Sequence, residues 1–195
     1  MPKRITIIQG HPDQQGRHYG HALAEAYAQG AEEAGHEVKR IEVAALDFPL
    51  LRTKEEFETG WPPEPIRTAQ DAISWADHLV LVYPLWLGSM PAVLKAFFEQ
   101  VFRPGFAFSY GESGRMPTKR LTGKSARIIV TMGMPAFFYR WFYLAHSLKS
   151  LERNILAFAG IGPIRASLIG MVEAGGEKQR ARWLEKIRAR GRAGR

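Results

Sequence analysis

The sequence contains no cysteine. This absence excludes a disulfide framework, a thiolate metal site and a cysteine nucleophile, and it fits a reducing compartment. No apolar run is long enough to cross a bilayer, and residues 1–4 lead straight into a strand pattern without the longer apolar region of a signal peptide. These absences predict a soluble, cytoplasmic protein.

Several catalytic motifs are also missing. There is no paired-carboxylate motif, no HExxH or similar metal spacing, and no GxSxG nucleophile elbow. His11, Asp13, His18 and His21 are close in sequence, but an anion-binding loop explains these residues better than a metal site without a defined ligand geometry. We therefore expect no bound metal.

Positive charge is in excess, but it is concentrated at one end of the sequence. The formal net charge is +8, and residues 175–195 hold eight Lys and Arg against Glu177 and Glu185, which gives +6 of that total. This distribution favours a solvated helix face with a frayed basic end over a nucleic-acid-binding arm. We therefore expect no nucleic-acid partner.

The 195 residues, 46% apolar and 11% aromatic, suffice for one α/β domain over residues 1–195 with a sizeable core. Strands are expected at residues 4–10, 36–43, 79–84, 124–131 and 163–170. Helices are expected at residues 19–34, 66–76, 92–102, 136–159 and 176–190, the last running into a basic tail within 176–195. Residues 44–65 and 103–123 are expected to be irregular. This alternation predicts a doubly wound three-layer α/β sandwich with a five-stranded parallel sheet.

The central feature is an unbroken apolar run, Leu79 to Tyr83, that ends at Pro84. Such a run is typical of a strand buried on both faces of a parallel sheet. Pro91 then opens a helical pattern, where its missing N–H costs nothing. Because ligands bind at the carboxyl ends of such strands, Trp86 lies where a flat ring could meet a flat ligand.

The first loop, residues 10–18, lies between a strand end and a helix start. Free backbone N–H groups and the positive end of a helix favour a phosphate there. Gly16 permits close backbone approach, Arg17 supplies charge and a fork of donors, and His11 and His18 add donors. The loop matches neither GxGxxG nor the Walker pattern, so a polar turn with capping residues stays an alternative.

Two further loops, at residues 84–88 and 131–135, follow adjacent strand ends. Their backbone amides, beside Trp86 and Leu87, could hold the edge and face of a planar heterocycle. Ordinary hydrophobic packing of these two side chains is the alternative. Three loops at one edge of the sheet favour a nucleotide or flavin site.

Residues 137–143 form the densest aromatic cluster, most of which we expect in the core or at a subunit interface. Tyr139 lies just past the third loop, and His146 lies about two helical turns further on. A phenol and an imidazole facing a ring could stabilise negative charge on a reduced cofactor. A packed tyrosine and a capping histidine are the alternative.

A set of segments, in this order and spacing, covers nearly the whole chain: Gly10-His11 with its following helix, Asp47-Phe48-Pro49, residues 84–95, residues 98–102, residues 105–108, and Thr131-Met132-Gly133. With these segments the sequence resembles the flavodoxin-like NAD(P)H:quinone oxidoreductases, the DT-diaphorase-like family. The Pro-Ala-x-Leu-Lys motif that begins at Pro91 is the most specific of them.

The resemblance implies a flavodoxin-like sheet, a tightly bound flavin, and a homodimer with two sites at its interface. It also implies two-electron transfer from NAD(P)H to a small quinone-like acceptor by a ping-pong route. FAD is the expected flavin and FMN the alternative. Gln15-Gly16-Arg17-His18 stands where the family usually has Ser or Thr and then Asn, which leaves the phosphate contacts and the choice between FAD and FMN open.

By position, the resemblance also assigns roles to individual residues. The phosphate tail of the flavin would contact His11, Arg17 and His18. Its ring would lie against Pro84, Leu85, Trp86 and Leu87, with the ring edge near Thr131, Met132, Gly133 and Met134; Met134 stands where a second glycine is common. Tyr139 would be the charge-stabilising phenol, and His146, one position later than in the family, would be its partner.

Other functions stay open on the same fold. An FMN-dependent azo- or nitro-compound reductase is the nearest alternative. Relatives of this family act as cytoplasmic accessory subunits of potassium-efflux systems, so a regulatory partner of a membrane transporter is a second, less favoured alternative. A flavin-storage or sensor protein with negligible turnover is a third.

Overall fold

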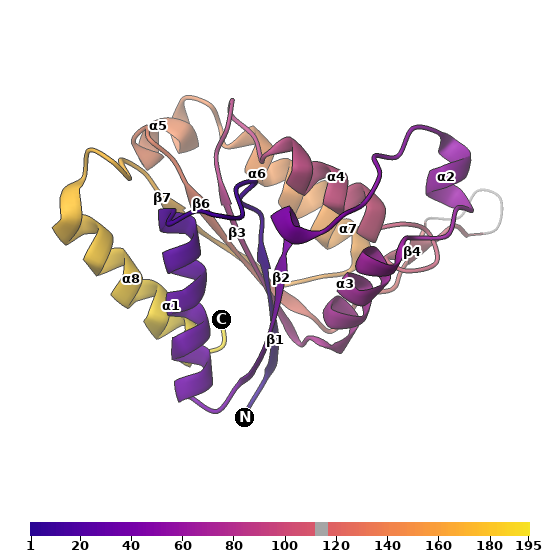
Figure 1. Ribbon diagram of the computed structural model, residues 1–195, viewed down its shortest axis with the longest axis horizontal. Helices are drawn as coiled ribbons and strands as arrows, with labels where there is room; N and C mark the ends of the chain where they lie inside the picture. Colours follow the sequence, from indigo (N-terminus) through magenta and orange to yellow (C-terminus); the bar gives the residue numbers. More distant parts are fainter. Residues whose placement is uncertain (112–116) are drawn as a thin grey trace.

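A computed structural model of the protein describes residues 1–111 and 117–195. Five parallel strands form one sheet in the order β2-β1-β3-β6-β7 (Figure 1). The strands are β1 (Arg4–Gln9), β2 (Glu37–Glu42), β3 (His78–Pro84), β6 (Ser125–Thr131) and β7 (Ile164–Ile169). This arrangement confirms the predicted five-stranded parallel sheet.

Helices cover both faces of this sheet, which gives the predicted three layers (Figure 1). One face carries α1 (Tyr19–Glu33) and α8 (Gly176–Arg192), which share an apolar cluster with the sheet that includes Leu23 and Ile187. The other face carries α3 (Glu64–Trp75), α4 (Ala92–Val101) and α6 (His146–Ser150) over a larger cluster. Both faces of β3 are therefore covered, which is why its sequence is an unbroken apolar run.

The segments predicted to be irregular contain short elements. Val43–Ala45 form a 3₁₀ turn, η1, and Lys54–Glu58 form α2, whose first turn is capped by Thr53 through a hydrogen bond that Glu56 N donates to Oγ1 at 3.1 Å. β4 (Phe108–Ser109) and β5 (Thr118–Lys119) form a small antiparallel pair. Residues 112–116 of the second segment lie outside the described residues.

The predicted helix at 136–159 is divided into several pieces. These are α5 (Ala136–Trp141), α6, a stretch of π-helix η2 (Leu151–Leu156) and α7 (Ala157–Ala159). Leu144 and Ala145 separate α5 from α6 with φ angles of 53° and 49°. Left-handed backbone cannot continue a right-handed helix, so the chain changes direction there.

The C-terminal end is docked on the sheet, so the prediction of a frayed end was wrong. Lys3 Nζ donates to Gly194 O at 2.8 Å, and Arg127 Nε donates to Arg195 O at 2.7 Å. Glu33 of α1 is paired with Arg188 and, at 2.9 Å, with Arg192. Some basic residues of α8 therefore make structural contacts, while others are solvated.

Two glycines allow α1 and α8 to approach closely. A Cβ added to Gly30 would lie 2.0 Å from the carbonyl oxygen of Arg188, and one added to Gly191 would lie 2.1 Å from that of Tyr27. Only a residue without a side chain fits such a backbone contact. Over the described ranges, no helix has both the length and the apolar character needed to cross a membrane.

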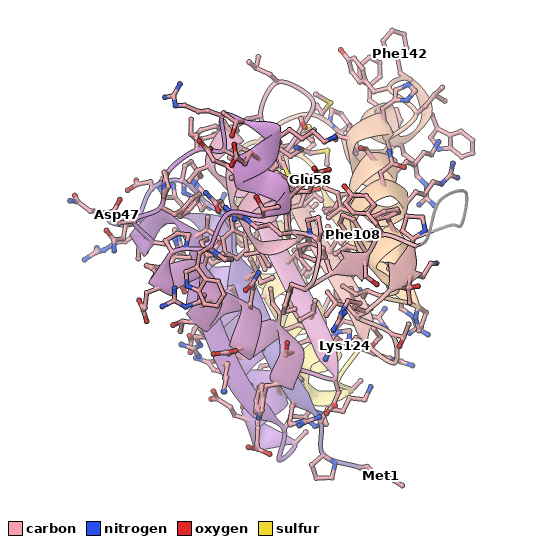
Figure 2. All side chains as sticks on the ribbon, turned by 90° about the vertical axis from the view of Figure 1, so that its right-hand side faces the viewer. Met1, Asp47, Glu58, Phe108, Lys124 and Phe142 are labelled. Atoms are coloured by element: carbon pink, nitrogen blue, oxygen red, sulfur yellow. The ribbon has the colours of Figure 1, made fainter. Side chains whose placement is uncertain are left out.

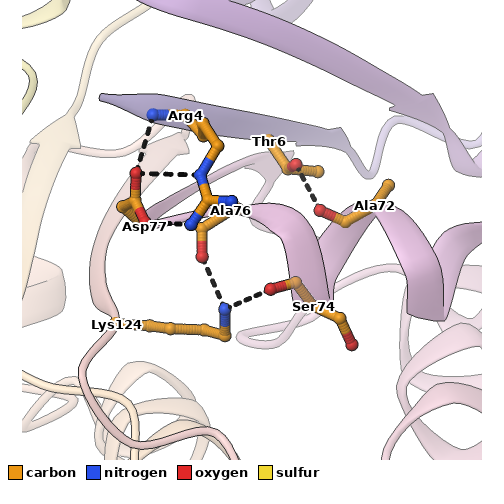
Figure 3. Close-up of polar contacts among 7 residues, drawn as sticks. All are labelled: Arg4, Thr6, Ala72, Ser74, Ala76, Asp77 and Lys124. Carbon is orange, nitrogen blue, oxygen red and sulfur yellow. Dashed lines mark hydrogen bonds and ion pairs between the residues drawn. The ribbon is translucent and has the colours of Figure 1, made fainter. Parts of the chain in front are cut away.

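Polar contacts fix the amino end of the sheet, opposite the predicted site (Figure 3). Asp77 accepts hydrogen bonds from Arg4 N at 2.9 Å and from Arg4 Nη2 at 2.7 Å. Lys124 Nζ donates to the carbonyl oxygens of Ser74 at 2.6 Å and Ala76 at 2.5 Å. These contacts hold the end of α3 against the first residues of β1 and β6.

The Arg4–Asp77 pair predicts a dependence of stability on pH. The Arg4 guanidinium and backbone N–H lower the pKa of Asp77 from 3.8 to about 2. The pair therefore contributes stability above about pH 4, and this contribution is lost as the pH falls towards about 2. We expect Asp77→Asn to lower the free energy of unfolding in urea at about pH 6, and the difference from the wild type to shrink below about pH 4.

Asp71→Asn is the matched control, because Asp71 is an exposed carboxylate of the preceding helix with no ion pair among the described residues. A difference between wild type and Asp77→Asn that stays constant from about pH 6 to about pH 2 would contradict the assignment.

Candidate functional site

Strand pairing brings the three predicted loops together at the carboxyl edge of the sheet. Gly10 N donates to Val82 O at 2.8 Å, which ties the loop after β1 to the end of β3. Leu85 N donates to Thr131 O at 2.7 Å, which ties the loop after β3 to the end of β6. The three loops are therefore neighbours, as the order of the strands requires.

The first loop is held by hydrogen bonds between its own residues. Gln9 Oε1 accepts from His11 N at 3.1 Å, His11 Nδ1 accepts from Asp13 N at 3.1 Å, and Asp13 Oδ1 accepts from Gln15 N at 2.9 Å. His18 Nε2 lies 2.7 Å from Asp13 Oδ2. These contacts position the loop at the start of α1, where Arg17 is exposed.

Three imidazoles gather beside this loop. The rings of His11 and His18 stack with centroids 3.9 Å apart, and His21 lies 5.2 Å from His11. Burial, together with repulsion from His18 and His21, lowers the pKa of His11. Over the described ranges, no group of three or more His, Cys, Asp or Glu is arranged to hold a metal ion.

Two buried polar atoms lie close to the start of α1, in residues that line a small pocket between α1 and β2. Gln9 Nε2 and His21 Nδ1 are buried and have no hydrogen-bond partner within residues 1–111 and 117–195. Leaving such groups unpaired costs about 1–3 kcal/mol each. A Cβ at Gly16 would lie 1.8 Å from the ring of exposed His18, so the two residues pack closely. A polar or anionic group bound at the start of α1 would meet the first N–H groups of that helix.

The second loop presents a tight turn with two exposed apolar side chains. Trp86 and Ser89 exchange backbone hydrogen bonds of 2.8 and 2.9 Å, and Leu87 and Gly88 between them have φ angles of 47° and 76°. A leucine in left-handed backbone is strained, and such strain is commonly found at functional sites. Trp86 is 51% exposed, and its ring centroid lies 6.2 Å from that of His11.

The third loop is only partly available for binding. Thr131 and Met132 are buried, and Met132 N donates to Ile169 O at 2.9 Å. Gly133 is exposed, and a Cβ added to it would meet no atom within 4 Å. Met134 is half-buried, with its carbonyl oxygen accepting from Met171 N at 3.1 Å. Of the four predicted contacts in this loop, Gly133 has the most open surroundings.

Tyr139 is buried, and its hydroxyl is bonded to residues other than the predicted partner His146. Its ring is 1% exposed, and its hydroxyl lies 2.7 Å from Ser147 Oγ and accepts from Leu148 N at 3.2 Å. His146 is exposed and makes no contact with that hydroxyl. The cause is the break between α5 and α6, which turns Ser147 rather than His146 towards Tyr139.

We predict that Tyr139→Phe affects stability more than catalysis. The variant leaves the N–H of Leu148 and the hydroxyl of Ser147 without their partner, so the free energy of unfolding should fall by about 1–3 kcal/mol. Urea unfolding measures this loss, and stopped-flow reduction with NADPH should show an unchanged rate. A large fall in that rate with no loss of stability would contradict this assignment.

The aromatic patch, formed by Phe137, Phe138, Trp141, Phe142 and Tyr143, projects into solvent beside the site. Four of its members are between 46% and 75% exposed, and Phe138 is 39% exposed. Figure 2 shows Phe142 at the end of the molecule opposite Met1, which is the carboxyl edge of the sheet. Exposed apolar groups gathered this closely mark an interaction surface.

Sequence reasoning missed Gln9 and gave His21 no role separate from the other residues of the first loop. Gln9 is polar but lies at the end of a buried strand, and that position was its only signal. His21 lies in the first turn of α1, and the structure adds that its ring centroid is 5.2 Å from that of His11.

Comparison with known proteins first gives the fold class of this chain. The sequence profile of a family described by its flavodoxin-like fold matches residues 3–191 of this chain. The fold and the three loops at its carboxyl edge therefore define a flavodoxin-like α/β protein.

Individual relatives narrow this class. An uncharacterized NAD(P)H oxidoreductase of Haemophilus influenzae is 30% identical over 185 residues, covering 92% of this chain and 89% of the relative. An FMN-dependent NADH:quinone oxidoreductase of Nitratidesulfovibrio vulgaris is 28% identical over 199 residues, covering 88% of this chain and 90% of the relative. The solved NAD(P)H:quinone oxidoreductase of Methanothermobacter marburgensis superposes with a TM-score of 0.84 at 26% identity, covering 98% of both chains. This chain belongs to the flavodoxin-like NAD(P)H:quinone oxidoreductase family.

Proposed function

We propose that this protein is a flavin-dependent oxidoreductase that transfers two electrons from NAD(P)H to a small quinone by a ping-pong route. The observation that carries the proposal is the convergence of three loops around exposed Trp86 and Gly133. The names of the relatives agree with it.

The first loop would hold the phosphate of the flavin. Arg17 and the first N–H groups of α1 supply positive charge, and His18 and His21 supply further donors.

The second and third loops would hold the ring. Trp86 and Leu87 offer apolar surface, with half-buried Pro84 and Leu85 behind them, and Gly133 leaves room for close approach. When bound, the flavin supplies the redox chemistry, taking hydride from NAD(P)H and passing it to the quinone. The chain would orient that ring between the second and third loops and cover one side of it with Trp86 and Leu87.

We propose FMN as the flavin. The sequence resemblance favoured FAD, but the relative from Nitratidesulfovibrio vulgaris is named for FMN. Mass spectrometry of the molecule released on denaturation of the purified protein separates the two. Release of FAD would overturn this choice while leaving the proposed reaction intact.

A second copy of the chain would close the open side of the site. The fully exposed Leu87 lies at this edge with the members of the aromatic patch Phe138, Phe142 and Tyr143, and these apolar groups need cover. We therefore propose a homodimer with a site at each side of its interface. Light scattering of the purified protein tests it, and a monomer at micromolar concentration would contradict it.

Steady-state oxidation of NADPH with a benzoquinone tests the function itself. We expect turnover that depends on the acceptor and exceeds that of free flavin at the same concentration, because the protein orients both substrates against the ring. Parallel lines in a double-reciprocal plot would indicate the ping-pong route. Turnover no faster than free flavin would favour a binding or sensor protein instead.

A further inference from the structure

A groove runs along the outer edge of the sheet, and two members of the aromatic patch, Phe137 and Trp141, form part of its lining. It has a volume of about 1150 Å³ and lies at β7, between α5 and α6 on one side and α8 on the other. Figure 1 shows β7 at the end of the sheet, with α5 and α8 beside it. We call it the β7 groove.

The floor of this groove is a strand edge with free backbone groups. Ala126 N donates to Pro163 O, and Met132 N donates to Ile169 O, so the odd-numbered residues of β7 point their backbone groups towards β6. Because backbone groups alternate along a strand, those of Ala166 and Leu168 point outward into the groove. Both residues line it, and β6 is the only strand paired with β7 within the described residues.

The other edge of the sheet is protected differently. Four of the six residues of β2 are charged, which discourages pairing with another chain. In β7 only Arg165 of six residues is charged. The edge of β7 thus lies between helices, and its outward backbone groups are able to pair with an added strand.

The walls of the groove are cationic. Six basic side chains line it, with Glu152 as the single acidic one: Arg127, Arg140, Lys149, Arg165, Lys186 and Arg190. None of the six has an ion-pair partner over the described ranges. Burial and repulsion from Arg190, Arg165 and Arg195 lower the pKa of Arg127, so an anion here would relieve a repulsion that the chain leaves in place.

The two sides of the groove differ in character. Arg165 and Ser167 share the α8 face with Arg127, whose Nη1 donates to Ser167 Oγ at 2.9 Å. Leu168 belongs to the opposite face, where Leu148 of α6 also lines the groove. Four of the six cations lie on the α8 face, whereas the other face carries Arg140 and Lys149 beside Leu148 and Leu168. An added strand would therefore meet more positive charge with one set of alternate side chains than with the other.

We propose that the β7 groove binds an extended acidic segment of a partner protein, which adds a sixth strand to the sheet next to β7. The segment would alternate acidic and apolar residues over about 20 Å, the length of a six-residue strand. Backbone pairing with Ala166 and Leu168 would fix its register, and the cations would select its charge.

A second copy of this chain fits the groove less well. A symmetric dimer through β7 would place each set of cations against the same set in its partner. Repulsion between like charges in a partly buried interface opposes such pairing. A nucleic acid would satisfy the charges but would leave the strand edge unpaired.

Fluorescence anisotropy with a labelled heptapeptide of alternating glutamate and valine tests the proposal on the full-length protein. We expect binding that weakens about tenfold when alternate backbone nitrogens of the peptide are methylated, since these N–H groups pair with the strand edge. A lysine–valine peptide of the same length should not bind. An oligonucleotide of equal charge should bind at least about tenfold more weakly than the acidic peptide.

Three variants test whether the acidic peptide binds in the β7 groove. Lys186→Glu and Ala166→Pro should each weaken binding by about tenfold, the first through charge and the second by removing an outward N–H. Lys178→Glu is the matched control, an exposed residue of the same helix outside the groove, and should change affinity by less than about twofold. Urea midpoints close to the wild type would show that the variants fold.

Three results would each overturn the proposal. The first is no binding of the acidic peptide. The second is equal binding of the methylated peptide or of the oligonucleotide, which would make the groove a general polyanion surface. The third is a change in the mass of the unliganded protein caused by Ala166→Pro, which would show that a second copy fills the groove. None of these readouts depends on the flavin.

Discussion

Gly30→Val is expected to lower the free energy of unfolding by about 3 kcal/mol, a large part of the stability of an ordinary domain. The Cβ would lie 2.0 Å from the carbonyl oxygen of Arg188, and backbone cannot move aside as a side chain can. Relief requires α8 to move away from α1, which weakens the packing of Ile187 and the pairing of Glu33 with Arg188 and Arg192. Urea or thermal unfolding measures the loss.

Gln29→Val is the matched control, since Gln29 is the exposed neighbour of Gly30 on the same helix. It should change the free energy of unfolding by less than about 1 kcal/mol. Gly191→Val changes the α8 side of the close contact between α1 and α8, and it should lower the free energy of unfolding as Gly30→Val does. Stability of Gly30→Val equal to that of Gln29→Val would show that the two helices do not cross here.

Gly133→Leu should weaken flavin binding by about 100-fold with little change in the stability of the flavin-free protein. A Cβ at Gly133 meets no atom within 4 Å, and its φ is not in the left-handed region, so the fold alone does not require glycine. If the flavin ring lies against this backbone, a leucine side chain would occupy its place. Flavin fluorescence titration gives the dissociation constant, and urea unfolding of the flavin-free protein gives the stability.

Gly133→Ala provides the graded control, because one methyl group should weaken binding much less than leucine does. An unchanged dissociation constant for Gly133→Leu would remove the third loop from the ring site. It would leave the assignment of the first loop to the phosphate untouched, because His18 and Arg17 act on the other end of the flavin.

Much of this fold was predictable because its signals are local. The apolar run from Leu79 to Tyr83 is long enough for a strand and too short for a helix, and β3 spans His78–Pro84. Strand and helix alternation then required parallel pairing, and parallel pairing places successive loops at one edge. That reasoning alone predicts that the loops carrying His11, Trp86 and Thr131 lie next to one another.

Side-chain directions within the site were less predictable. Tyr139 and His146 were expected to face a ring together, yet left-handed backbone at Leu144 and Ala145 places Ser147 against the phenol instead. Neither leucine nor alanine signals positive φ, because both rarely adopt it. The hydrogen-bond partners of Tyr139 therefore depend on a turn between α5 and α6 that the sequence of this turn does not indicate.

The sequence by itself determined the order of the strands and helices, the single edge at which the loops meet, and the family, because periodicity and motif spacing are properties of short segments. Only the tertiary structure decided that α8 docks through Gly30 and Gly191, that Tyr139 is buried, and that unpaired cations surround the free edge of β7. Each of these depends on contacts between residues that are distant in sequence or on one unusual backbone angle, and neither leaves a periodic pattern in the chain.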